Sequence, residues 1–105
     1  MKQEYAIVLT TTATEQQARE MARSIVEQKL AACVQIHAID SFYTWKGELH
    51  EEPEWRLTIK AAAGTCAQLE QHIKTHHAYE TPEIIQIKIA GGDERYLDWI
   101  DETVR

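Results

Sequence analysis

The chain has 105 residues, of which 44% are hydrophobic and 27% are charged, the proportions of one soluble globular domain covering residues 1–105. The 17 aspartates and glutamates exceed the 11 lysines and arginines and give a net charge of -6, which argues against nucleic acid and anionic membranes as partners. No segment approaches the roughly 18 apolar residues of a membrane span, and the first residues show no signal-peptide pattern. The two cysteines, Cys33 and Cys66, lack CxxC or zinc-finger spacing and predict buried thiols in a cytoplasmic protein.

The first predicted elements are a strand and a helix. Residues 4–10 (EYAIVLT) are apolar through their middle without alternation, which predicts a central strand covered on both faces. The capping-box pair Thr14 and Gln17 then begins a helix of about four turns that ends near Leu30. Its apolar stripe consists of Ala18, Met21, Ala22, Ile25 and Val26. We expect the hydroxyls of residues 10–14 to serve as turn and cap partners.

A long hairpin is predicted next. Residues 31–45 predict a strand whose inward parity switches near Ala38, which indicates a bulge or a bend. After a turn at residues 46–48, residues 55–61 alternate between apolar and polar side chains and predict the returning strand. At about 3.3 Å per residue this hairpin is much longer than the first helix, so it should protrude from the domain. The aromatic residues that it carries are Phe42, Tyr43, Trp45 and Trp55.

An acidic run follows the turn of the hairpin. It consists of Glu48, His50, Glu51, Glu52 and Glu54. The favoured interpretation is a solvated, charged edge that discourages strand aggregation. The alternative is a surface that gathers divalent cations.

The second half predicts two more helices and a strand. The pattern assigns helices to residues 65–74 and 93–104, a loop to residues 76–83 and a strand to residues 85–89. The first of these helices begins at a second capping-box pair, Thr65 and Gln68, and the last begins at Asp93 as its N-cap. Pro82 keeps the loop from continuing as a helix.

The predicted order is β-α-β-β-α-β-α, which is typical of an α+β fold. Its first six elements form the ferredoxin-like βαββαβ sandwich, with an extra C-terminal helix and a long protruding hairpin between the second and third strands. Helices on one face of such a sheet leave the other face of the first strand uncovered. The uncovered face and the protruding aromatic arm together predict self-association.

The histidines before the loop are the candidate chemical residues. His72 and His76 lie one helical turn apart, and His77 follows directly. Imidazoles at this spacing can clamp a transition metal; the alternative is a polar helix end at which imidazoles meet the last carbonyl groups. No local signature of a catalytic dyad, triad or phosphate loop is present, so the sequence predicts no enzymatic activity.

Four motifs resemble the CutA family of divalent-cation tolerance proteins. They are KLAACV at residues 29–34, SFYTWKG at 41–47, HHAYETPEI at 76–84 and YLDW at 96–99. The resemblance covers nearly the whole chain, from the first strand to the last helix. The resemblance implies a ferredoxin-like fold, a tight homotrimer and a role in tolerance of copper and other divalent cations. It also implies that His76 and His77 are the metal ligands. Thr10 stands where copper-binding members have a cysteine, and Ala78 replaces the usual proline.

The functional expectation is a homotrimeric divalent-cation tolerance protein that is not a catalyst. It would bind Cu(II) or another divalent metal weakly through His76 and His77, with no organic cofactor and no nucleic-acid partner. Nitrogen and oxygen donors without a thiol disfavour Cu(I). The alternative, also implied by the resemblance, is a trimeric PII-like signalling module that binds a small effector in the clefts between subunits.

Overall fold

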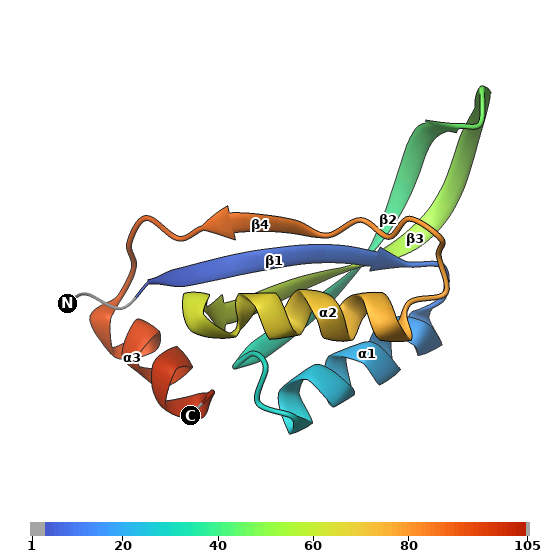
Figure 1. The fold of residues 1–105 in the computed structure, drawn as a ribbon. Helices are drawn as coiled ribbons and strands as arrows, with labels where there is room; N and C mark the ends of the chain where they lie inside the picture. The colour runs from blue at the N-terminus through green and yellow to red at the C-terminus, as the bar shows by residue number, and fades with distance from the viewer. Residues whose placement is uncertain (1–3, 105) are drawn as a thin grey trace.

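The computed structural model describes residues 4–104. Its four strands are β1 (Tyr5–Thr12), β2 (Cys33–Trp45), β3 (Glu48–Ala62) and β4 (Ile85–Lys88). They form one sheet in the order β2-β3-β1-β4, in which every neighbouring pair is antiparallel (Figure 1). The helices are α1 (Glu15–Glu27), α2 (Cys66–His76) and α3 (Glu94–Thr103), with a short 3-10 turn at Ala63–Thr65. The α+β, ferredoxin-like prediction is confirmed, including the extra C-terminal helix.

The main core lies between one face of the sheet and the helices α1 and α2. Alternation along β1 and β3 directs one parity of side chains towards the helices. The buried members are Ala6, Val8, Leu57, Ile59 and Ala61 from the sheet, Ala18, Met21 and Ile25 from α1, and Cys66, Leu69 and Ile73 from α2. Burying each larger aliphatic side chain contributes about 1.5–3 kcal/mol, which fixes both helices on the sheet.

A second, smaller core lies on the opposite face of the sheet, where α3 covers one end. Tyr5, Ala62 and Ile100 are buried there together. Because α3 covers the second face here, the beginning of β1 is covered on both faces, as the apolar run predicted. The remainder of that face holds Ile7 and Leu9 of β1 beside their register partners Ile87 and Ile85 of β4. Both β4 isoleucines are more than two-fifths exposed, and we call these four residues the open face.

The hairpin of β2 and β3 projects from the end of the sheet opposite α3 (Figure 1), so the predicted protrusion is confirmed. We call its outer part, residues 40–53, the arm. The predicted bulge near Ala38 is wrong, because the register of β2 and β3 is unbroken from Cys33 to Trp45. The parity switch instead marks the place where the strand leaves the core for the arm. A two-residue turn closes the hairpin with positive φ at Lys46 (52°) and Gly47 (81°), the backbone of a type I′ turn.

The first helix is shorter than predicted. It ends at Glu27, because Lys29 takes a left-handed conformation (φ 58°) and the Leu30 N–H donates back to the carbonyl of Ile25. This is the geometry with which helices commonly stop, although the left-handed position is usually a glycine. The helix therefore ends at a left-handed lysine, and the sequence has no glycine there from which the end could be predicted.

The second helix begins differently from the prediction. The Thr65 hydroxyl caps no N–H of α2; it donates instead to the carbonyls of Leu30 and Ala62, tying the helix start to the chain before β2. The helix itself runs to His76, two residues beyond the predicted end. The prediction of a buried thiol is confirmed for Cys66, whereas Cys33 is only half-buried. Within residues 4–104, no helix has the length and hydropathy needed to cross a membrane.

Candidate functional site

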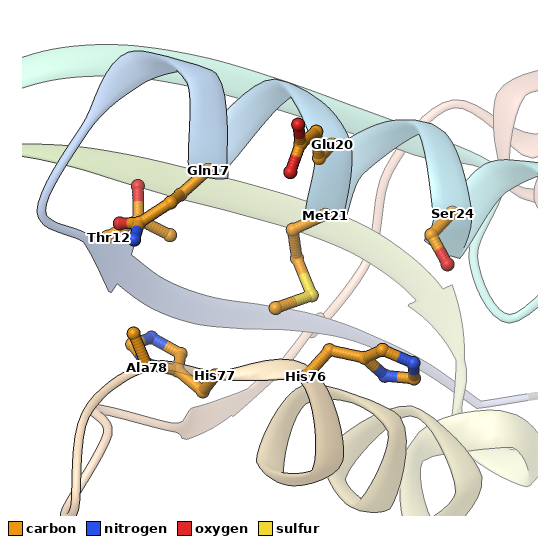
Figure 2. A pocket seen from close by; sticks show the side chains of 8 residues that line it. All are labelled: Thr12, Gln17, Glu20, Met21, Ser24, His76, His77 and Ala78. Atoms are coloured by element: carbon orange, nitrogen blue, oxygen red, sulfur yellow. The ribbon is translucent and has the colours of Figure 1, made fainter.

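A small cavity of about 180 Å³ opens between the beginning of α1 and the end of α2. Its lining residues are Thr12, Gln17, Glu20, Met21, Ser24, His76, His77 and Ala78. Figure 2 shows the Met21 side chain reaching from α1 towards the two histidines on the other wall. The cavity thus places the predicted metal residues opposite polar groups of the first helix.

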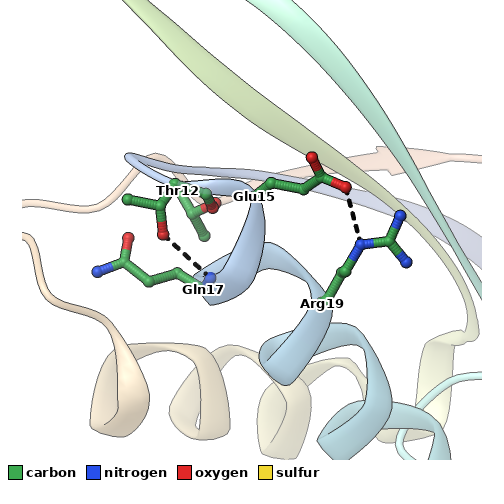
Figure 3. Close-up of polar contacts among 5 residues, drawn as sticks. Thr12, Glu15, Gln17 and Arg19 are labelled. Atoms are coloured by element: carbon green, nitrogen blue, oxygen red, sulfur yellow. Dashed lines mark hydrogen bonds and ion pairs between the residues drawn. The ribbon is translucent and has the colours of Figure 1, made fainter.

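The wall on α1 is held in place at the start of the helix. The Thr14 hydroxyl accepts a hydrogen bond from the Gln17 N–H (3.1 Å), which confirms the predicted cap. The Thr12 hydroxyl donates to the Thr14 carbonyl (2.9 Å). One turn on, Arg19 pairs with Glu15 at 2.8 Å, as Figure 3 shows. Capping of this kind contributes about 1 kcal/mol to helix stability.

His76 lines the cavity and uses one of its ring nitrogens in a hydrogen bond. Its Nδ1 lies 2.8 Å from the carbonyl oxygen of His72. Because a carbonyl can only accept, Nδ1 carries the hydrogen, and the lone pair of the neutral ring lies on Nε2. The alternative interpretation of the histidines, imidazoles meeting the last carbonyls of a helix, is confirmed for His76. Its Nε2 nevertheless stays available to a ligand.

His77 uses both of its ring nitrogens. Its Nε2 donates to the Thr11 carbonyl (2.6 Å), and its Nδ1 accepts from the Tyr79 N–H (3.0 Å). These hydrogen bonds join the loop of residues 77–83 to the end of β1. In this arrangement the His77 lone pair points at a backbone N–H, and His77 can bind a metal only if that hydrogen bond opens.

His72 connects the two helices beneath the cavity. It is buried, its Nε2 lies 2.9 Å from the Ser24 hydroxyl of α1, and its ring centroid lies 4.2 Å from that of His76. Burial, with a smaller contribution from His76, lowers the pKa of His72. The ring is therefore neutral at physiological pH and serves to join α1 to α2.

The polar groups around His76 do not form a closed metal site among the described residues. In the described part of the chain, no three histidine, cysteine, aspartate or glutamate side chains are arranged to hold one ion. Thr10 is fully buried, and its hydroxyl finds no hydrogen-bond partner among residues 4–104. The expectation that the hydroxyls of residues 10–14 act as turn and cap partners thus holds for Thr12 and Thr14 but is wrong for Thr10. A single imidazole nitrogen beside polar groups gives low affinity for a divalent ion.

A larger cavity, about 800 Å³ in volume, lies between the arm and the 77–83 loop. On its wall Tyr79 donates a hydrogen bond to Glu54 (2.7 Å), whose side chain is buried. Burial and this hydrogen bond raise the pKa of the Tyr79 phenol. Its lining residues are Thr11, Ile39, Asp40, Ser41, Phe42, Tyr43, Trp45, Glu54, Arg56, Ala78, Tyr79, Glu80, Thr81 and Glu83.

Glu54 is the residue of this cavity that the sequence analysis placed wrongly. It was predicted to be part of a solvated acidic edge, but only 7% of it is exposed. Strand alternation gives no signal for this burial, because in the unbroken register of β3 Glu54 shares a face with Arg56 and equally with Glu48, His50 and Glu52 of the acidic run. The Tyr79 hydroxyl that contacts Glu54 comes from a loop 25 positions later in the chain.

Comparisons with known proteins agree with this architecture. The family of the CutA1 divalent ion tolerance protein matches residues 6–103. The divalent-cation tolerance protein CutA of Thermus thermophilus is 40% identical over 98 residues, which are 92% of this chain and 95% of that protein.

Two solved structures are closely similar. One is the periplasmic divalent cation tolerance protein CutA of Archaeoglobus fulgidus, with a TM-score of 0.94 and 36% identity over 96% of this chain and 99% of that chain. The other is the PII-like protein CutA of Nostoc sp. PCC 7120, with a TM-score of 0.91 and 30% identity over 95% and 97% of the two chains. This chain belongs to the CutA1 divalent ion tolerance protein family.

Proposed function

We propose that this chain acts as a homotrimer in divalent-cation tolerance, binding divalent metal weakly and without catalysis, in the cytoplasm. The open face supports the trimer, because Ile85 and Ile87 are exposed there, and the rings of Tyr96 and Trp99 on α3 are also exposed. The arm adds further apolar surface, since Phe42 is 66% and Leu49 72% exposed. Apolar surface of this extent is typical of an interface between subunits.

The single observation that carries the metal proposal is the orientation of His76. Its Nδ1–H is used by the His72 carbonyl, which leaves Nε2 as a lone-pair donor on the wall of a cavity that Glu20 also lines. Nitrogen and carboxylate donors suit Cu(II) and Zn(II). His77 remains the second proposed ligand, available when the 77–83 loop releases its Nδ1. Two cysteines without a disulfide are consistent with the reducing compartment that we propose.

Calorimetry with Cu(II) and Zn(II) tests this proposal. We expect weak binding at pH 7.5 that disappears at pH 5.5, because protons compete with the metal ion for the imidazole lone pair. His76→Ala should abolish binding, whereas His77→Ala should weaken it less. The control is His37→Ala, which removes an exposed histidine of β2. Binding that survives His76→Ala would remove the metal site from this cavity.

The second candidate function is a PII-like module that binds a small effector in the clefts between subunits. The larger cavity favours it, because about 800 Å³ lies within the range of small-molecule sites. The similarity to the PII-like protein of Nostoc gives further support.

A further inference from the structure

Arg56 lies on the wall of the larger cavity and has no ion-pair partner among residues 4–104. Its Nε is fully buried and has no hydrogen-bond acceptor in the part of the chain that the structure describes. A buried donor that finds no acceptor destabilises the protein. The enclosed Nε is out of reach of a ligand in the cavity, but the two terminal nitrogens of the guanidinium can bind a planar carboxylate through two parallel hydrogen bonds.

The other charged groups of the cavity are all acidic. They are Asp40, Glu54, Glu80 and Glu83. The Tyr79 hydroxyl occupies Oε2 of Glu54, and none of the four carboxylates pairs with Arg56 among residues 4–104. This combination repels a ligand with several negative charges and attracts one that carries an ammonium group.

Four aromatic side chains also line the cavity. Phe42, Tyr43 and Trp45 reach the cavity from the arm, and Tyr79 reaches it from the loop. Such faces bind apolar or aromatic groups, and they also attract cations through their negative ring faces.

We propose that this cavity binds a small zwitterion of the amino-acid type, with its carboxylate on Arg56, its ammonium group towards the acidic wall and an apolar side chain against the aromatic residues. The inference rests on the second candidate function and names the chemical class of its effector. A simple cation would leave Arg56 unpaired, and a simple anion would face four carboxylates. The zwitterion alone satisfies both kinds of group.

Calorimetry on the whole protein with three probes tests this inference. L-phenylalanine carries both charged groups, phenylalaninamide lacks the carboxylate, and 3-phenylpropionate lacks the ammonium group. We expect L-phenylalanine to bind at least about tenfold more tightly than either of the other two, which corresponds to one lost charge-assisted interaction. Quenching of tryptophan fluorescence provides a second readout, since Trp45 lines the cavity.

Variants of Arg56 complete the test. Arg56→Gln should weaken L-phenylalanine by about tenfold or more and leave phenylalaninamide unchanged, and Arg56→Lys should restore part of the affinity. The matched control is Arg23→Gln, which removes an exposed arginine of α1. The unfolding midpoint and the mass by light scattering show whether each variant keeps its fold and assembly.

The possible failures are distinguishable. If phenylalaninamide binds as tightly as L-phenylalanine, or if Arg56→Gln leaves binding unchanged, the zwitterion proposal is wrong while an effector site stands. If no probe binds, both the zwitterion and the effector function lose their support. If Arg56→Gln changes the mass of the assembly, Arg56 is an interface residue and the proposal is overturned.

Discussion

Tyr79 donates a 2.7 Å hydrogen bond to Glu54, a carboxylate 25 positions earlier in the chain. This bond fastens the 77–83 loop to β3, while His77 fastens the same loop to the end of β1 through the Thr11 carbonyl. The loop therefore spans the end of the sheet between two attachment points. Its position separates the small cavity at His76 from the larger cavity at the arm, because Ala78 lines both.

Removing the Tyr79 hydroxyl should destabilise the protein. Tyr79→Phe leaves the buried Glu54 oxygen without a donor, and we expect the free energy of unfolding to fall by about 1–3 kcal/mol. Tyr43→Phe is the control, because it removes a comparable hydrogen bond to Glu52 from an exposed position on the arm; it should leave the stability unchanged. Denaturant unfolding measures both, and equal effects would contradict the importance of the buried pair.

Thr10 and Thr12 lie on the same face of β1, but replacing each by valine should change the stability in opposite directions. Thr10→Val removes a buried hydroxyl without a partner and should stabilise the protein by about 1 kcal/mol. Thr12→Val removes the hydrogen bond to the Thr14 carbonyl and should destabilise the protein by about 1 kcal/mol. Thermal and denaturant unfolding test the pair. A loss of stability in Thr10→Val would mean that its hydroxyl has a partner in solution.

His72 should make the stability depend on pH. Its pKa is lowered by burial and by His76, so between that lowered pKa and the unfolded value of about 6.5 the unfolded chain binds more protons than the folded protein. Stability should therefore fall as the pH falls through this window. His72→Gln, which does not titrate, should flatten the dependence measured between pH 7 and 5. His37→Gln, at an exposed position, should keep the wild-type slope, and identical slopes in all three proteins would exclude His72 as the cause.

The arm should contribute to assembly through its aromatic residues. Trp45→Ala should weaken the trimer by about 2 kcal/mol or more, because a large aromatic side chain at an interface is typically a strong contributor. His50→Ala, across the same hairpin, should have a much smaller effect. Light scattering over a dilution series compares the two. Equal dissociation of both variants, or a monomeric wild-type protein, would show that the arm does not dock on a neighbouring subunit.

Local chemistry explains what the sequence could predict. The caps at Thr14 and Asp93 depend on an N–H three residues later, so both were predictable and both are confirmed. The element order followed from the periods of the apolar residues, and the protruding hairpin followed from its length alone. These features need no information from distant parts of the chain.

The candidate site depends on contacts between distant residues, and here the prediction was incomplete. His77 forms a hydrogen bond with Thr11, which lies 66 positions earlier in the chain. The residues next to His77 in sequence do not predict this hydrogen bond. Glu54 resembled its acidic neighbours because the loop that covers it comes later in the chain. Thr65 had the spacing of a cap, but carbonyl groups of Leu30 and Ala62 compete for its hydroxyl.

The unbroken pairing of β2 with β3 restricts how the reach of the arm can be engineered. Deleting one residue from one strand would exchange the two faces of that strand beyond the deletion, since side chains alternate along it. Deleting two residues from each strand would leave every remaining side chain on the same face of the hairpin and opposite the same cross-strand partner. It would shorten the arm by about 7 Å at the usual rise per residue. The arm can thus be lengthened or shortened in increments of two residue pairs, with the Lys46–Gly47 turn carried unchanged at its tip.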